Sequence, residues 1–120
     1  MNKRKVGAQY EELAADFLIK KGIKVLERNF RCRGGEIDLI GKDGRTIVFF
    51  EVKYRKNKDA GYPIEAVDHK KQATISRVAD YYRLTHGLSE AGAFRFDVIG
   101  ILGEDITWYR NAFEYVRYYR

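Results

Sequence analysis

Apolar positions recur along this chain with two different periods, and these periods predict where helices and strands lie. Leu13, Phe17 and Leu18 recur at helical spacing and predict a helix over residues 8–21. A similar stripe predicts a second helix over residues 64–86. Shorter apolar runs predict five strands, over residues 23–30, 36–40, 46–53, 94–102 and 106–109. The order predicts an α/β domain with a mixed sheet flanked by helices.

Glycine-containing pairs predict the turns between the first three strands, Gly34–Gly35 for the first hairpin and Asp43–Gly44 for the second. The third strand carries the continuous apolar run Ile47–Phe50, which is typical of a central strand buried on both faces. Residues 55–63 are polar, basic and glycine-containing, and we expect a mobile loop there.

The second turn sets the register between the second and third strands. If its loop is the Asp–Gly pair, Asp38 lies opposite Phe49 and Glu36 lies opposite Glu51. Because side chains alternate between the faces of a sheet, one face then carries Glu36, Asp38, Glu51 and Lys53. Asp38 and Glu51 would be diagonal neighbours, with Cα atoms roughly 7–8 Å apart. A one-residue change in loop length would put these two acids on opposite faces.

Asp38, Glu51 and Lys53 are the residues with the clearest chemical meaning. Charged groups are costly to bury unless they are paired or bound to a metal. Two carboxylates can hold a divalent cation, and a lysine beside them can orient a water molecule and stabilise charge on a phosphate. The set therefore predicts a Mg²⁺-dependent phosphodiesterase. Each residue alone also fits a salt-bridged strand end, but the three together favour function.

Three further residues each have a functional and a structural interpretation. Glu11 lies at the edge of the first apolar stripe, where its carboxylate either completes the metal site or pairs with a basic neighbour at the surface. Glu36 either binds the metal or lies in water at a sheet end, paired with Arg33. Lys71 either reaches a phosphate or extends to solvent.

Composition narrows the class of protein. A length of 120 residues suffices for one domain, over residues 1–120, and the 45% hydrophobic and 33% charged content is typical of a soluble globular protein. No apolar run approaches the roughly 20 residues that cross a bilayer, and no signal-peptide pattern is present, so we expect a cytoplasmic protein without membrane association. Cys32 is the only cysteine, which excludes an internal disulfide and a cysteine zinc cluster.

The charge distribution is compatible with a nucleic-acid partner. The net charge is +6, the pI is about 9.4, and basic residues flank the acids on both sides. Asp97 shares a strand face with Arg95, and a structural salt bridge of Asp97, for instance to a basic residue of the first hairpin, is favoured over a catalytic role. The tail, residues 111–120, is aromatic and is either packed or part of an interface.

Motifs over nearly the whole chain resemble the bacterial YraN family. The matching segments are Gly7-x-x-x-Glu11-x-x-Ala14, Asn29 to Ile40, Phe50-Glu51-Val52-Lys53-x-Arg55, Lys71 and Arg95 to Val98. The Gly-Glu-Ile-Asp-Leu and Glu-Val-Lys elements are the specific ones. This family is predicted to be nuclease-like and is similar to archaeal Holliday junction resolvases and to the PD-(D/E)xK nucleases. Ile37 stands where those nucleases often carry proline.

The resemblance implies a restriction-endonuclease-like fold, with a central mixed five-stranded sheet flanked by helices. It assigns Glu11 as the helix acid and Asp38 and Glu51 as the core ligands of a Mg²⁺ or Mn²⁺ ion. It assigns Lys53 as the catalytic lysine. Because resolvases act on two strands, the resemblance is also compatible with a homodimer.

We therefore expect a metal-dependent endonuclease that acts on DNA, including branched or recombination-type structures. Backbone phosphates would be contacted, without any reading of sequence, by Arg31, Arg33, Arg55 and Lys71. Two alternatives stay open at this point. One is a domain that binds nucleic acid without cutting it, and the other is a protein-interaction module in DNA processing.

Overall fold

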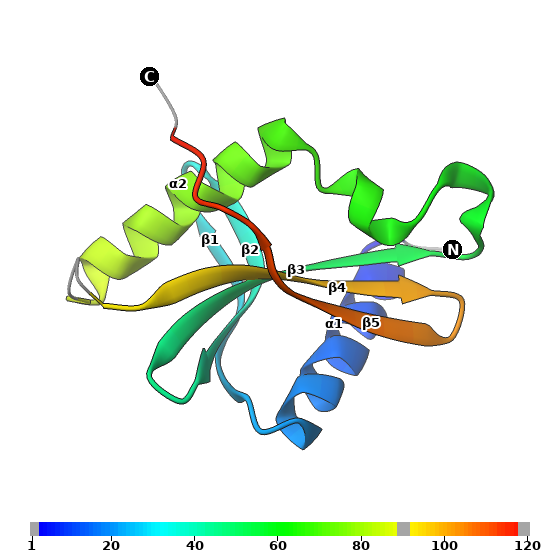
Figure 1. Ribbon diagram of the computed structural model, residues 1–120, viewed down its shortest axis with the longest axis horizontal. Helices are drawn as coiled ribbons and strands as arrows, with labels where there is room; N and C mark the ends of the chain where they lie inside the picture. Colours follow the sequence, from blue (N-terminus) through cyan, green and yellow to red (C-terminus); the bar gives the residue numbers. More distant parts are fainter. Residues whose placement is uncertain (1–2, 89–91, 118–120) are drawn as a thin grey trace.

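The computed structural model describes residues 3–88 and 92–117. Figure 1 shows two long helices around one five-stranded sheet. The helices are α1 (Lys3–Lys20) and α2 (His69–Thr85), and the short 3₁₀ helices η1 (Lys58–Ala60) and η2 (Pro63–Ala66) precede α2. The strands are β1 (Lys24–Cys32), β2 (Gly35–Asp43), β3 (Thr46–Arg55), β4 (Phe94–Leu102) and β5 (Asp105–Phe113). Of the helices described, none has the length and apolar character needed to cross a membrane.

The five strands lie in the sheet in the same order as in the chain. Neighbouring strands are antiparallel except β3 and β4, which are parallel because the chain returns through α2 between them. β3 is central, and its segment Val48–Glu51 is buried. The predicted mixed sheet with a central, doubly covered third strand is confirmed.

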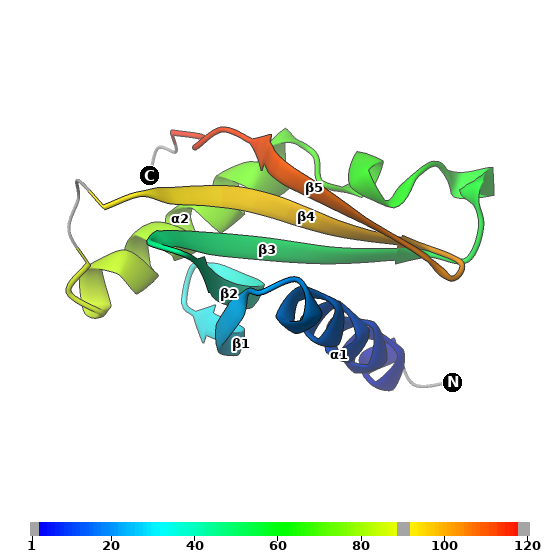
Figure 2. The ribbon, with the colours of Figure 1, turned by 60° about the horizontal axis from the view of Figure 1, so that its bottom comes forward.

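The two helices cover opposite faces of the sheet, as Figure 2 shows. On one face α1 packs through Ala14 and Leu18 in a cluster that includes Phe50. On the other face α2 packs through Val78 in a cluster that includes Phe49. Adjacent residues of β3 thus serve opposite cores, because side chains of a strand alternate between the two faces.

The first hairpin turn lies one residue earlier than predicted. It is formed by Arg33–Gly34, because Cys32 already pairs with Gly35. Gly35 belongs to the strand, with φ at +144°, and α2 passes so close that a Cβ there would lie 2.7 Å from the Thr74 methyl group. A glycine is therefore required at this position by packing and backbone conformation rather than by the turn itself.

The second hairpin turn lies one residue later than predicted. Gly44–Arg45 form the loop, so that Asp43 pairs with Thr46. Gly44 has φ at +62°, the sign that a type II′ hairpin turn requires at its first loop residue. The register between β2 and β3 is consequently shifted by two residues, and Phe49 lies opposite Ile40 instead of Asp38. A shift of two by itself keeps the predicted faces. In β2, however, the alternation is interrupted near Asp38, because Ile37 packs in the cluster with α2 whereas Leu39 packs in the cluster with α1.

The predicted second helix is interrupted near its start. Residues 63–66 form the separate helix η2, and α2 begins only after Asp68, whose carboxylate accepts a hydrogen bond from Lys71 N–H at 2.9 Å. The predicted helix cannot run through Asp68, because a capping residue has an extended backbone conformation. Residues 58–60, within the expected loop, form η1. Lys71 is thereby placed in the first turn of α2.

The strand β5 is longer than predicted at both ends, and the described part of the tail is packed. Phe113 stacks on Phe96 with ring centroids 5.0 Å apart. The Tyr115 hydroxyl donates a hydrogen bond to Asp80 of α2 at 2.6 Å. The remaining tail aromatics, Tyr118 and Tyr119, lie outside the described residues.

The predicted structural role of Asp97 is confirmed, although its partner is not in the first hairpin. Arg95 Nε lies 3.0 Å from Asp97 Oδ1. The fully buried Asp97 also accepts hydrogen bonds from Trp108 Nε1 at 2.9 Å and from Asn111 N–H at 2.8 Å. Its lone pairs are therefore used within the sheet.

Candidate active site

The predicted acids meet where β2 separates from β3. The ladder between these strands ends at Leu39 and Phe50, whereas β3 continues beside β4 as far as Arg55. Asp38 is the next residue of β2, and its Oδ2 accepts a hydrogen bond from Val52 N–H at 2.8 Å. The Asp38 side chain thus accepts the backbone hydrogen bond of β3 at the point where the backbone of β2 no longer pairs with it.

Glu51 is almost completely enclosed, with 3% of its surface exposed. Its Oε2 lies 3.1 Å from Lys71 Nζ and 3.9 Å from Lys53 Nζ. Burial raises the pKa of Glu51 to about 9; a hydrogen bond with Asp38 and the charge of Asp38 act in the same direction, against the two lysines. Asp38 and Glu51 are the next residues after the last β2–β3 pair, Leu39 and Phe50, so the register does not make them the diagonal neighbours that were predicted.

Lys71 reaches this acid from the opposite face of the sheet to α1. Burial by itself would lower the pKa of Lys71, but the nearby Glu51 carboxylate outweighs burial and the pKa is raised. The side chain remains 35% exposed, so its ammonium group faces both Glu51 and solvent. Lys71 is thus an ion-pair partner of the site, a role that neither predicted alternative included.

Glu11 extends from α1 toward the same acids, as predicted. Burial raises its pKa to about 7, the charges of Asp38 and Glu36 add to the rise, and a hydrogen bond from Asn29 opposes it. Asn29 has φ at +53°, a conformation that asparagine adopts more readily than most residues. Nothing in the hydrophobic pattern singles out Asn29; the available signal is an asparagine inside a strand, where this residue is depleted.

Glu36 faces Arg31 across β1 and β2, not Glu51 across β2 and β3. Arg31 Nε lies 3.4 Å from Glu36 Oε2. The predicted like-charge pair with Glu51, and the alternative pairing with Arg33, are both wrong. Glu36 nevertheless joins the site, since one carboxylate oxygen each of Glu11, Glu36 and Asp38 lies within 4.8 Å of the other two.

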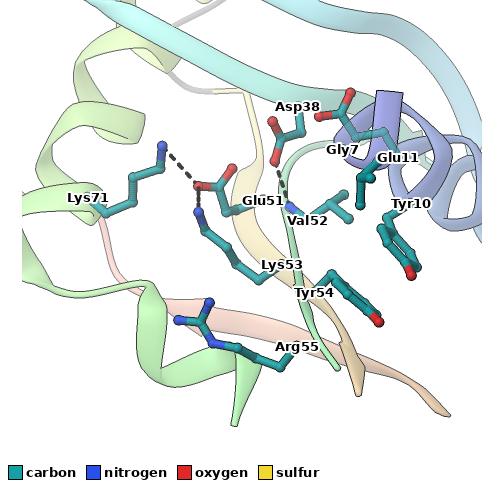
Figure 3. A pocket seen from close by; sticks show the side chains of 11 residues that line it. Gly7, Tyr10, Glu11, Asp38, Glu51, Val52, Lys53, Tyr54, Arg55 and Lys71 are labelled. Carbon is teal, nitrogen blue, oxygen red and sulfur yellow. Dashed lines mark hydrogen bonds and ion pairs between the residues drawn. The ribbon is translucent and has the colours of Figure 1, made fainter. Parts of the chain in front are cut away.

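The site opens to solvent through a hollow of about 490 Å³, shown in Figure 3. This volume is in the range of ligand-binding clefts. Its lining includes most of the predicted functional residues, namely Glu11, Asp38, Glu51, Lys53, Arg55 and Lys71. A second hollow of about 450 Å³ shares Glu11 and Asp38 and extends to Arg31 and Glu36. Arg33 lines neither hollow and lies at the adjacent β1–β2 turn.

Two tyrosines in the lining were not predicted to belong to the site. Tyr10 of α1 and Tyr54 of β3 stack with ring centroids 3.7 Å apart and an interplanar angle of 12°. Each is the sequence neighbour of a predicted site residue, Glu11 or Lys53. Adjacency to Lys53 did not predict that Tyr54 lines the site, because neighbouring side chains of a strand point to opposite faces; the hollow lies at the edge of the sheet, where both faces are reachable.

The donor set fits a hard divalent cation. Every acid at the site offers carboxylate oxygens, which Mg²⁺ and Mn²⁺ prefer. The acids come from three different elements, and burial, reinforced by the mutual repulsion of the acids, raises the pKa values of Glu11 and Glu51. A cation would relieve this repulsion. Glu11, Glu36 and Asp38 lie close enough together to share one, and Glu51 lines the same hollow as Glu11 and Asp38.

Comparison with known proteins gives one consistent family. A family model described as uncharacterised protein family UPF0102 matches residues 10–101. A UPF0102 protein of Lachnoclostridium phytofermentans is 44% identical over 114 residues, covering 95% of this chain and 97% of the relative. One of Caldicellulosiruptor bescii is 50% identical over 101 residues, covering 84% and 85%. One of Photobacterium profundum is 45% identical over 115 residues, covering 93% and 92%.

Proposed function

This chain belongs to the UPF0102 family, as its resemblance to YraN predicted, and from its site we propose that it is a divalent-metal-dependent endonuclease acting on DNA. The observation that carries the proposal is the meeting of Glu11, Asp38 and Glu51, from α1, β2 and β3, in one hollow. Lys53 lines the same hollow. Branched or recombination-type DNA is the proposed substrate class.

The arrangement of elements supports a restriction-endonuclease-like fold as part of this proposal. A helix, a three-stranded antiparallel meander, a crossover helix and a parallel fourth strand follow one another along the chain. The acids lie next to the last β2–β3 pair, Leu39 and Phe50, where these two strands separate.

The acids supply the ligands, and the cation supplies the electrophile. Glu11, Asp38 and Glu51 would hold Mg²⁺ or Mn²⁺, and Glu36 is close enough to contribute. When bound, such an ion polarises a phosphate oxygen and lowers the pKa of a water molecule. The Asp38 carboxylate is kept in place by its hydrogen bond from Val52 N–H, so one ligand is positioned before any metal arrives.

The lysines act on the phosphate and on the attacking water. Lys53 Nζ lies at the rim of the hollow, 3.9 Å from Glu51, where it can donate a hydrogen bond to water or to a phosphate oxygen. Lys71 holds the Glu51 carboxylate at 3.1 Å from the other side. Both ammonium groups oppose the charge that develops on the phosphate during cleavage.

The arginines would hold the flanking backbone. Arg31 and Arg55 line the two hollows, and Arg33 lies at the neighbouring turn. Contacts to phosphates position a nucleic acid without reading its sequence. The net charge of +6 supports such binding, which should weaken steeply as salt concentration rises. Cutting two strands would need two sites, so a homodimer remains part of the proposal.

The deciding experiment measures cleavage of labelled four-way-junction, flap, single-stranded and linear duplex DNA, with Mg²⁺ and then with Mn²⁺. The parent protein is compared with Glu51→Ala and with Glu104→Ala, which changes an exposed acid in the β4–β5 turn. We expect cleavage by the parent and by Glu104→Ala, and none by Glu51→Ala. Absence of metal-dependent cleavage on every substrate, or equal cleavage by all three proteins, would refute the proposal.

One observation favours a second candidate, a nucleic-acid-binding module that does not cut. Glu51 already has two cationic neighbours, Lys71 and Lys53, which neutralise it without a metal. In that case the acids have a structural role at the sheet edge where β2 and β3 separate. Salt-sensitive binding of DNA, unchanged by Mn²⁺ and unaccompanied by cleavage, would identify this alternative.

A further inference from the structure

We propose that the wall of the hollow formed by Tyr10, Tyr54 and Arg55 is a subsite for one unpaired nucleotide, which selects single-stranded or branched nucleic acid. The base would stack on the tyrosine pair, and Arg55 would bind an adjacent phosphate. This inference deepens the proposed function and rests on it for the meaning of the adjacent acids. It rests on three features of the hollow: an aromatic surface, a guanidinium group that forms no ion pair within the described part of the chain, and a strand edge.

The aromatic surface is the stacked pair. Tyr10 and Tyr54 lie with ring centroids 3.7 Å apart and nearly parallel, and both side chains are half-buried. Figure 3 shows the two rings side by side at one end of the hollow, with the acids at the other end. The pair is anchored on one side by α1 and on the other by β3, so it offers a preformed planar surface. Bases stack on such surfaces irrespective of their identity.

The guanidinium group belongs to Arg55. Lys53 and Lys71 both have Glu51 as an acidic partner, whereas Arg55 makes no ion pair with any acid in residues 3–88 and 92–117. Its Nε is also buried without a hydrogen-bond acceptor in that part of the chain. A buried donor without an acceptor is costly unless a ligand satisfies the group. Phosphate oxygens are the acceptors that a planar guanidinium group binds best.

The strand edge follows from the way in which backbone hydrogen bonds of β3 alternate between its two neighbouring strands. Ile47 N–H bonds to Ala93 O, and Gly103 N–H bonds to Arg55 O, so the odd-numbered residues of β3 bond to β4. The even-numbered residues point their backbone groups toward β2, as the hydrogen bond from Val52 to Asp38 shows. Tyr54 N–H points the same way, at a position where β2 no longer pairs with β3. The residue that offers the ring therefore also offers a backbone donor.

These features together fit a nucleotide better than a duplex. A planar ring stack, a guanidinium group and a backbone N–H match one base and one phosphate. In a duplex the faces of the bases are already stacked on their neighbours, so a base reaches the tyrosine pair only if it is unpaired. The acids at the other end of the hollow would then face the next phosphodiester bond, which places cleavage beside the unpaired nucleotide.

The test measures binding without cleavage. Fluorescence anisotropy in EDTA compares an oligothymidylate with a strand of the same length in which abasic residues replace the nucleosides, so that the phosphates are retained. We expect the parent to bind oligothymidylate more tightly. Tyr54→Ala should weaken that binding by about 5- to 150-fold, the range for loss of one base–aromatic stack, and leave abasic binding unchanged. Tyr54→Phe should keep the preference.

Tyr81→Ala is the matched control, because Tyr81 is a 49% exposed tyrosine that lines a different hollow, beside Cys32 and Arg33. A second measurement needs no variant: a strand that carries 2-aminopurine should lose fluorescence on binding to the parent. The subsite would be overturned if the parent bound both strands with equal affinity, or if Tyr54→Ala weakened the binding of both strands equally. Undiminished 2-aminopurine emission on binding would also overturn it.

Cleavage with Mn²⁺ is scored separately, so that the two proposals can fail independently. If the parent cuts DNA but shows no preference for the strand with bases, the subsite is wrong and the nuclease stands. If the preference for the strand with bases depends on Tyr54 while no substrate is cut, the nuclease proposal is wrong and the subsite stands as part of a binding module.

Discussion

Asp38 and Glu51 are the next residues after Leu39 and Phe50, the last pair of the neighbouring antiparallel strands β2 and β3. Carboxylates this close to one another repel, and burial disfavours the charged form of Glu51 further. The burial of Glu51 makes it the group that keeps the proton, with a pKa of about 9. A cation that binds Glu51 must therefore compete with this proton and with the ammonium groups of Lys71 and Lys53.

Glu51→Gln should separate stability from activity. At neutral pH the amide is close in shape and charge to the protonated acid, so we expect the melting temperature of the metal-free protein to change little. Binding of Mn²⁺ and cleavage should both be lost, because an amide cannot supply a carboxylate ligand. Calorimetric titration with Mn²⁺ and thermal melts in EDTA measure the two effects. A large drop in melting temperature in EDTA would mean that the charge of Glu51 is needed for folding.

The stability of the metal-free protein should fall as the pH rises. The pKa values of Glu11 and Glu51, both about 4.5 when unperturbed, rise to about 7 and about 9 in the folded state. The folded state then binds more protons than the unfolded state, so the stabilisation is complete below pH 4.5 and is lost as the pH passes through 7 and 9. Urea unfolding in EDTA at several pH values measures the slope.

Saturating Mn²⁺ should flatten this pH dependence, since a bound cation stabilises the deprotonated acids. The double variant Glu11→Gln, Glu51→Gln should flatten it without metal. A stability that increases with pH over the same interval in EDTA would contradict the assignment of raised pKa values to these two acids.

Asn29→Ala should weaken metal binding through Glu11. The hydrogen bond from Asn29 lowers the pKa of Glu11, so its loss should make the acid harder to deprotonate. We expect Mn²⁺ binding to weaken by about 10- to 100-fold, as for other residues that orient a ligand, and to recover partly at higher pH. Calorimetric titration at two pH values measures this.

Asn111→Ala is the matched control for this change, because Asn111 also has a positive φ, +49° against +53° for Asn29. It lies in β5, outside both hollows of the site. Both variants should lose similar stability, since alanine is strained in this conformation. Equal Mn²⁺ affinity of the two variants would assign Asn29 a structural role only.

Asp97→Ala should damage the fold and spare the metal affinity of the molecules that remain folded. Asp97 is fully buried and accepts hydrogen bonds from Arg95, Trp108 and Asn111. Removing one partner of a buried ion pair typically costs about 3–5 kcal/mol. The free energy of unfolding in urea measures this loss, and Mn²⁺ titration at low temperature tests the site. A preserved stability would show that the sheet does not depend on this network.

The hydrophobic pattern predicted the elements better than their boundaries. The strand over residues 94–102 has the predicted limits, because its apolar positions end at glycines, Gly92 shortly before the strand and Gly103 directly after it. The helix predicted over residues 64–86 is interrupted at Asp68, since a side-chain cap competes locally with an apolar stripe that continues past it. The turns were each displaced by one residue, because glycine marks a bend without stating which loop position it occupies.

The sequence by itself determined which acids and lysines are available, and that Glu51 and Lys53 share one face of β3, because alternation along a regular strand is a local property of the backbone. It did not show that β2 interrupts this alternation between Ile37 and Leu39. Only the tertiary structure decided which groups touch. The hydrogen bond from Val52 to Asp38, the approach of Asn29 to Glu11 and the stacking of Tyr10 on Tyr54 depend on where β2 leaves β3 and on how α1 crosses the sheet edge. Such contacts join residues far apart in sequence, and no local period carries information about them.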